Sequence, residues 1–176
     1  MTGANGWLAR DASELEAGAE LVTLGRTITE ADVVSFAALT GDWHPQHADA
    51  GWAARGRFGE RVAHGMLVLS YAVGLVPFDP ERVVALRGLD SVAFKRPVRI
   101  GDTIRVLVRV ERVSPLDDGH ALVGLLWRIV NQEDRVVARA HVDALWRDLR
   151  SAPRNGANGQ PPAVATDDIY GDQVLL

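Results

Sequence analysis

Three segments in the C-terminal half of the chain place an apolar residue at every second position. They are residues 103–113, 121–129 and 136–146, and turn-forming residues at 117–119 and 131–134 separate them. Alternation with a period of two is typical of strands that bury one face. The pattern predicts an antiparallel meander of three strands with one apolar face. That face comprises Ile104, Val106, Val108, Val110, Ala121, Val123, Leu125, Trp127, Ile129, Val136, Ala138, Ala140, Val142, Ala144 and Trp146.

A different pattern precedes the meander. Residues 65–76 are apolar nearly all round a helical projection, and Pro77 follows them. Such a segment is typical of a helix that is buried on every side. A sheet with one apolar face and an apolar helix are complementary surfaces. We therefore expect an α+β fold in which a curved antiparallel sheet wraps around the helix at 66–76.

Shorter elements are predicted upstream and between these segments. Strand patterns are found at residues 21–24, 83–86 and 91–94. Thr29, with the acidic Asp32 three positions on, is a helix N-cap signature, and the helix that it begins is expected to end at a glycine just before residue 42.

Length and composition limit the classes of protein. The 176 residues suit one domain, which we place at 20–150, with an N-terminal extension at 1–19 and a flexible, Pro- and Gly-rich C-terminal tail at 151–176. The absence of cysteine excludes disulfides and thiolate metal sites. A net charge of -4 argues against binding to nucleic acid or to an anionic membrane, and no apolar run is long enough to span a bilayer. We expect a cytoplasmic protein.

The segment GDWHPQH at 41–47 carries the first candidate chemistry. Asp42 and His47 stand five residues apart in a loop stiffened by Pro45. A carboxylate and an imidazole held in this way can orient a water molecule and remove its proton. Taken alone, such a pair is more often a loop-capping aspartate with a surface histidine.

Two further motifs follow, AHGML at 63–67 and FKRPVRIGD at 94–102. Together with GDWHPQH they closely resemble the MaoC-like, (R)-specific enoyl-CoA hydratase branch of the hot-dog fold, over residues 25–149. Three motifs in family order reverse the preference for a plain surface loop.

The resemblance implies a long helix wrapped by an antiparallel sheet, commonly paired into homodimers with continuous sheets. It implies a hydro-lyase that hydrates a trans-2-enoyl thioester of CoA or acyl-carrier protein to the (R)-3-hydroxyacyl thioester, with no bound cofactor or metal. The resemblance implies that Asp42 and His47 of this chain would hold the attacking water. The backbone N–H of Gly65 would stabilise the thioester oxygen, which suits a glycine at the N-terminus of a helix.

Further residues are expected at the substrate site. His64 is expected to bond neighbouring backbone beside the pocket. His44 stands where the family usually has asparagine, so it puts the identity of the substrate in doubt more than the reaction type. Val73 and Val76 on the apolar helix could limit acyl chain length, although core packing would explain them equally.

Basic and aromatic residues near the motifs have two interpretations each. Lys95 and Arg96, with Arg55 and Arg57, could contact the phosphates of CoA or of phosphopantetheine, or could form an ordinary solvated surface. Trp43 and Trp52 could belong to a lid or to a dimer contact, or could simply be buried.

Two other functions stay open at this point. A hot-dog thioesterase would direct water to the carbonyl carbon, but such enzymes generally place their acid elsewhere. A non-catalytic subunit of a heterodimeric dehydratase would be expected to lack the aspartate or the histidine.

Overall fold

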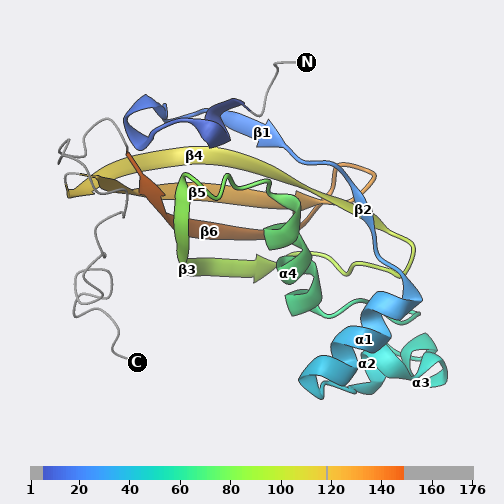
Figure 1. Cartoon of the computed structure of the whole chain (residues 1–176). Helices are drawn as coiled ribbons and strands as arrows, with labels where there is room; N and C mark the ends of the chain where they lie inside the picture. Colours follow the sequence, from blue (N-terminus) through green and yellow to red (C-terminus); the bar gives the residue numbers. More distant parts are fainter. Residues whose placement is uncertain (1–5, 118, 149–176) are drawn as a thin grey trace.

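The computed structural model describes residues 6–117 and 119–148, and its centre is an antiparallel sheet (Figure 1). The strands are hydrogen-bonded in the order β1-β4-β5-β6-β3, and the short β2 pairs with β4. This confirms the predicted meander and the α+β class. The strands are β1 (Glu20–Val22), β2 (Arg26–Thr27), β3 (Val83–Phe94), β4 (Thr103–Asp117), β5 (His120–Val130) and β6 (Val136–Arg147).

One face of the meander forms the core, as the alternation predicts. Every residue predicted for the apolar face is at most 4% exposed, apart from the partly buried Val136. The residues face one another across the register that pairs Val108 with Trp127 and Trp127 with Ala140. Stacking these side chains in adjacent strands gives the helix a continuous apolar surface to pack on.

Helix α4 (Gly65–Leu75) lies across this surface (Figure 1), with Leu67 and Ala72 at most 2% exposed. Its opposite side is open, because Met66 is 54% exposed and Ser70 is also exposed. The prediction that this helix is buried on every side is therefore wrong within one chain. An apolar composition on all sides indicates that a helix is buried, but it does not say whether the sheet of the same chain covers every side.

The segment before the meander is one strand rather than the two short strands predicted at 83–86 and 91–94. β3 pairs with β6 along its length, with register shifts at three places, and Ser91 has a positive φ of 50°. Bulges of this kind interrupt the period of two that marks a strand in the sequence. β3 is also the edge of the sheet, and its outward apolar residues are 36–50% exposed: Val84, Leu86, Leu89, Val92 and Phe94.

The described part of the predicted N-terminal extension packs on the sheet. Two 3-10 turns, Gly6–Ala9 and Ala12–Glu14, bury Trp7 and Leu8 to 6% and 3% exposure. Trp7 stacks on Trp146 of β6 with ring centroids 6.3 Å apart. The domain limits at 20 and 150 stay predictions, and the predicted tail at 151–176 lies outside the described residues.

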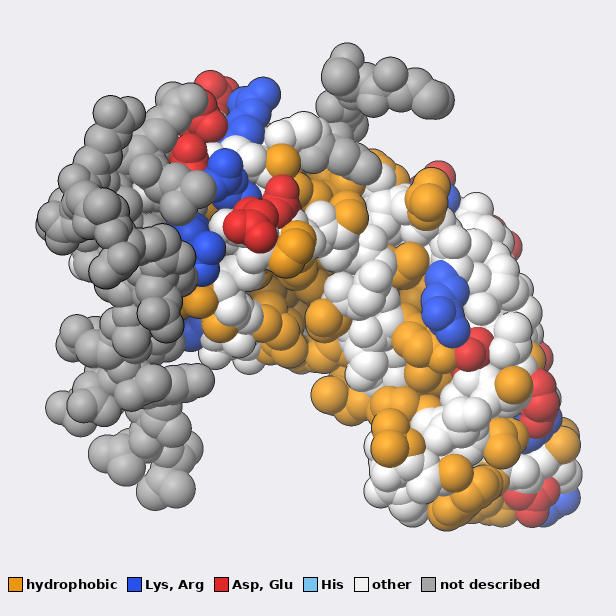
Figure 2. Space-filling view, viewed as in Figure 1, with side chains coloured by type: hydrophobic (Ala, Val, Ile, Leu, Met, Phe, Trp, Pro, Cys, Tyr) orange, Lys and Arg blue, Asp and Glu red, His pale blue; other side chains and the backbone are white. Residues whose placement is uncertain are grey.

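Helices α1 (Glu30–Thr40), α2 (Pro45–Ala48) and α3 (Ala50–Ala54) form a lobe at one end of the sheet (Figure 1). Thr29 and Asp32 form the predicted capping box of α1, and Gly41, with φ 77°, ends the helix. The chain thus enters the GDWHPQH segment from a well-defined helix end. Apolar side chains are exposed between this lobe and the sheet (Figure 2). Among the described residues, none of the helices is long and apolar enough to cross a membrane.

Candidate active site

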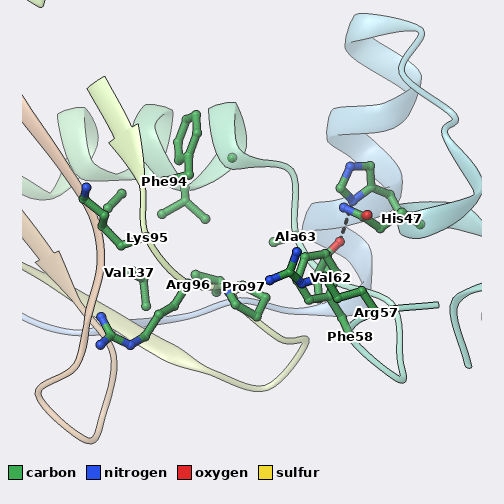
Figure 3. Close-up of a pocket in the computed structure, with 15 residues that line it drawn as sticks. His47, Arg57, Phe58, Val62, Ala63, Phe94, Lys95, Arg96, Pro97 and Val137 are labelled. Atoms are coloured by element: carbon green, nitrogen blue, oxygen red, sulfur yellow. Dashed lines mark hydrogen bonds between the residues drawn. The ribbon is translucent and has the colours of Figure 1, made fainter. Parts of the chain in front are cut away.

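His47 lies on the short helix α2 and contacts a segment that is remote in the sequence. Its Nδ1 is 2.6 Å from the carbonyl oxygen of Val62 (Figure 3). A carbonyl can only accept a hydrogen bond, so Nδ1 carries the proton. In the neutral ring Nε2 then holds a lone pair, which is what a general base requires.

His64 is the N-cap residue of α4 and is 2% exposed. Its Nε2 donates to the backbone carbonyl of Asp42 at 3.0 Å, so the bond to neighbouring backbone that the sequence predicts is present. The ring of His64 stacks on that of His47, while its buried Nδ1 has no hydrogen-bond partner among the described residues. His64 therefore ties the GDWHPQH segment to the beginning of α4.

Asp42 follows α1 in the loop, and its side chain is 53% exposed. Its Oδ1 accepts the backbone N–H of His44 at 3.2 Å, which fixes the carboxylate. One nitrogen or oxygen atom each of Asp42, His47 and His64 lies within 4.8 Å of the others. The predicted acid and base are thus brought together, at a separation that one water molecule can bridge.

The surroundings of His47 favour its neutral form. Burial lowers its pKa below the ordinary value of 6.5, and the nearby His64 and His44 lower it further. The hydrogen bond to Val62 and the Asp42 carboxylate raise the pKa, but by less in total. His47 is therefore available as a base at neutral pH.

The same three groups could supply metal ligands, so their geometry matters. Imidazole binds a metal through a lone pair in the plane of the ring. The rings of His47 and His64 are stacked with 28° between their planes and centroids 3.9 Å apart, so their lone pairs do not converge on one point. The arrangement suits a bridging water better than an ion.

Gly65 is the first residue of α4, and its amide belongs to the first turn, where N–H groups have no partner within the helix. A Cβ built at this position would lie 2.9 Å from the ring of Phe94. A side chain at position 65 would therefore displace the ring of Phe94. Both residues line the same cavity.

A cavity of about 530 Å³ opens between α2, the N-terminus of α4 and the end of β3. His47 lies on one side of it, and Phe94, Lys95 and Arg96 lie on the other (Figure 3). Asp42, His44 and His64 gather beside His47 without lining the cavity. The remaining lining residues are Gln46, Arg57, Phe58, Val62, Ala63, Gly65, Val68, Pro97, Val98, Val137 and Ala138.

Val73 and Val76, the predicted limits on acyl length, do not line this cavity. Val76 is 4% exposed in the core, and the partly buried Val73 packs against the same core. The structure supports the packing interpretation of both, and a role in acyl length stays a prediction.

Several residues of the candidate site gave no signal in the sequence. Val62 contacts His47 through a main-chain carbonyl, which no side-chain motif records. Gln46 and Phe58 line the cavity from the lobe, and Val137 and Ala138 from β6. β6 reaches the site beside the end of β3, where Lys95 N–H donates to Val137 O at 2.7 Å.

Comparison with known proteins places this geometry in a family. The model of a family described as MaoC like domain matches residues 13–124. The chain belongs to this family. The match includes all three motifs and ends within β5.

Two relatives with curated descriptions illustrate the family. Protein MaoC of Klebsiella aerogenes is 44% identical over 100 residues, which are 56% of this chain and 30% of that protein. An (R)-specific enoyl-CoA hydratase of Aeromonas caviae is 32% identical over 121 residues, 69% of this chain and 87% of the relative. The chain spans less than two thirds of the length of the first of these. Both support membership of the MaoC-like family, and the Aeromonas relative is the one named as a hydratase.

A solved structure agrees with the fold. A protein from Archaeoglobus described as a monoamine oxidase regulatory protein is 36% identical, with a TM-score of 0.75 over 79% of this chain and 95% of that one. The hot-dog fold that the resemblance implies is thereby confirmed.

Proposed function

We propose that the chain hydrates a trans-2-enoyl thioester reversibly to the (R)-3-hydroxyacyl thioester. The observation that carries the proposal is the hydrogen bond from His47 Nδ1 to the Val62 carbonyl, which leaves Nε2 free to act as a base. His47 lies beside the Asp42 carboxylate, and it lines a cavity together with Gly65, the first residue of α4. A base with a second titratable group beside it, and an oxyanion donor at the same cavity as the base, are the parts that water addition to an enoyl thioester needs.

The proposed chemistry balances within these groups. His47 and Asp42 hold one water, and one of them takes a proton as the oxygen bonds to the β-carbon. The electron pair of the double bond moves towards the thioester, whose oxygen accepts the N–H of Gly65. The proton taken from the water is then delivered to the α-carbon, so that the elements of water are added across the bond and both titratable groups return to their starting states. Losing one oxyanion donor typically costs about 2.7–4 kcal/mol of barrier height.

The carrier end of the substrate would lie at the basic rim. Lys95 and Arg96 line the cavity on the side opposite His47, and Arg57 lines it from the lobe (Figure 3). The phosphates of CoA or of phosphopantetheine suit this rim, while the apolar lining suits the acyl chain.

We also propose that two copies pair through β3. It is a sheet edge whose apolar residues are 36–50% exposed, and exposed apolar edges invite pairing with another strand. Pairing of two β3 strands would join the two sheets into one. A homodimer is the simplest assembly, and a related chain in a heterodimer would use the same edge.

The decisive assay incubates the purified chain with crotonyl-CoA and longer enoyl-CoAs, and follows enoyl absorbance and free thiol in parallel. Loss of absorbance without thiol supports a hydratase, and conversion of the product by an (R)-specific dehydrogenase establishes its configuration. Release of thiol would instead indicate a thioesterase. Inactivity towards both CoA and carrier-protein thioesters would contradict the proposal and favour a non-catalytic subunit.

Variants locate the reaction at the proposed site. Asp42→Asn and His47→Gln should each lower kcat by roughly 10²–10⁴-fold, the usual contribution of a general acid or base. His141→Gln is a matched control, since its Nδ1 lies 2.8 Å from Glu111 on the polar face of the sheet. Circular dichroism and sedimentation should be the same for all three variants. Near-native rates in Asp42→Asn or His47→Gln would show that the site is elsewhere.

A further inference from the structure

The ring of His44 caps the helix that carries His47. His44 is the N-cap residue of α2, and its Nδ1 lies 3.2 Å from the backbone nitrogen of Gln46. An amide N–H can only donate, so Nδ1 must accept and must be unprotonated. Because Pro45 has no amide hydrogen, the N–H of Gln46 is the first donor of α2 that needs a partner.

The main chain of His44 touches both proposed catalytic residues. Its N–H donates to Asp42 Oδ1 at 3.2 Å, and its carbonyl accepts the N–H of His47 at 2.8 Å. Almost any residue at this position would supply these two bonds. The bond from Gln46 depends on the imidazole ring, which is held edge-on to Trp52 with centroids 5.5 Å apart.

We propose that His44 is a positioning residue whose neutral ring caps α2 and so holds His47 in place, and that protonation of the ring removes the cap and lowers turnover. The proposal rests on the proposed hydratase function. It concerns a side chain that does not line the cavity, and it gives the histidine at this position a role separate from substrate contact.

Protonation is incompatible with the cap for a simple reason. Both nitrogens of an imidazolium ion are donors, so the Nδ1–H would face the N–H of Gln46 with no acceptor between them. The titratable groups that face the ring are Asp42, whose Oδ1 accepts the His44 N–H, His47, whose ring centroid is 6.2 Å away, and His64, which is stacked on His47.

A capping role and a purely electrostatic role of His44 predict opposite shifts of the acid limb of the activity profile. If His44 acted only through its positive charge, replacing it with a neutral residue would raise the pKa of His47, because that charge lowers it. The acid limb of activity would then move to higher pH. If His44 acts as a cap, a replacement that caps at every pH removes the additional loss of activity that protonation of His44 causes. The acid limb then moves to lower pH.

His44→Asn provides this test, because asparagine is among the best N-cap residues and does not titrate. We expect kcat/KM of the wild type to fall in acid with the slope of one that belongs to the base and with an additional step of about fivefold, the size of a typical cap loss, where the His44 ring is protonated. His44→Asn should keep the slope of one and lose the additional step. His44→Ala should also lack the step, with kcat/KM about fivefold lower near pH 8. His141→Asn should keep the wild-type profile. An additional step that persists in His44→Asn, or an acid limb at higher pH, would overturn the proposal.

A second measurement does not depend on activity. Nitrogen-15 NMR of the full chain should show His44 as the tautomer protonated at Nε2. The amide of Gln46 should be protected from hydrogen exchange when that ring is neutral and lose its protection as the ring titrates. In His44→Asn the protection should persist across the same range. If the protection of the Gln46 amide does not change when the His44 ring is protonated, or if the neutral ring carries its proton on Nδ1, the capping role is refuted. If the wild type hydrates no enoyl thioester, the function fails, but this result still decides the cap.

Discussion

The imidazole rings of His47 and His64 lie stacked, with centroids 3.9 Å apart and 28° between their planes. Each ring is oriented by a main-chain carbonyl on another segment, Val62 for His47 and Asp42 for His64. Two positive charges at this separation would repel strongly, and His64 accordingly lowers the pKa of His47. The stack therefore has an electrostatic effect on His47 as well as being a packing contact.

The first prediction concerns pH. Burial, and then the neighbouring histidines, keep the pKa of His47 below 6.5, so the acid limb of kcat/KM should lie below that pH. The unfolded chain binds the proton at the ordinary pKa while the folded chain does not. The free energy of unfolding should therefore fall as the pH drops below 6.5, and level off below the folded pKa. Urea unfolding of the wild type and of His47→Gln across this range measures the difference, and parallel curves would argue against the lowered pKa.

The second prediction concerns the contact between Gly65 and Phe94. A methyl group at 65 would lie 2.9 Å from the ring, which is half exposed and able to turn aside. Gly65→Ala should therefore change the free energy of unfolding by no more than about 1 kcal/mol. Because the displaced ring shares the cavity, kcat/KM should fall by roughly tenfold or more. Adding Phe94→Ala should restore part of the activity. If the double variant is no more active than Gly65→Ala, the displaced ring is not the cause.

The third prediction concerns the bond between Tyr71 of α4 and Asp32 of α1. The Tyr71 hydroxyl donates to Asp32 Oδ1 at 2.5 Å. Burial alone would raise the pKa of Asp32, but hydrogen bonds from Tyr71, Thr29 and Arg26 hold it at about 2. Tyr71→Phe should lower the free energy of unfolding by about 1.5 kcal/mol, since a bond to a charged group is lost.

The pH dependence of that difference identifies its cause. Asp32 contributes its stability above its ordinary pKa of 3.8 and loses it as the pH falls towards 2. The gap between wild type and Tyr71→Phe should therefore close over this interval. Arg26 should still stack on the ring in the variant, because its guanidinium carbon lies 3.8 Å from the ring centroid. A gap that does not change with pH would mean that Tyr71 acts through packing.

The fourth prediction concerns the basic rim. Lys95→Gln should raise KM for a CoA thioester by about two- to fivefold, in the range of an exposed ion pair, with kcat nearly unchanged and a smaller effect at high salt. An N-acetylcysteamine thioester has no phosphates, so its KM should not respond to the substitution. Equal changes in KM for both substrates would show that Lys95 does not bind the phosphates. Arg96 is a less clean test, because its guanidinium also donates to the carbonyl of Val136 at 2.6 Å.

The fifth prediction concerns assembly. Leu89 and Val92 on β3 are 38% and 37% exposed, and lysine at either position would place a charge in the proposed dimer contact. Sedimentation should show a dimer for the wild type and a shift towards monomer for Leu89→Lys and Val92→Lys. Leu24→Lys is the control, since Leu24 is 87% exposed in the loop between β1 and β2, towards the other edge of the sheet. Dimers of undiminished stability in the β3 variants would place the interface elsewhere.

The sequence predicted the strands of the meander well because each keeps a strict period of two while facing one core. It divided β3 because three register shifts break that period, and an edge strand with exposed apolar residues has no clean inner face. The turns that bury Trp7 and Leu8 were missed because 3-10 segments of a few residues have too few positions to show periodicity.

The candidate site was predictable where side chains carry the chemistry. The GDWHPQH motif led to Asp42 and His47, which the fold groups with His64 from another segment. Gly65 was expected from the family resemblance, and it lines the same cavity as His47. The orientation of His47 by a carbonyl and the capping by His44 were not predictable. Both depend on main-chain atoms whose positions are decided only by tertiary structure.

The main-chain bonds around the site have a consequence for how the proposed hydratase could change. Val62 N–H donates to Gln46 O, and Ala63 N–H donates to Val98 O, so the three motif segments are held together independently of their side chains. Val62, Ala63 and Val98 also line the cavity. If the cavity holds the acyl chain as proposed, mutations of these three residues would alter which acyl group is accepted without separating Asp42, His47 and Gly65. The proposed substrate range and the geometry of the site would then be separately adjustable, which would favour diversification of the one while the other is retained.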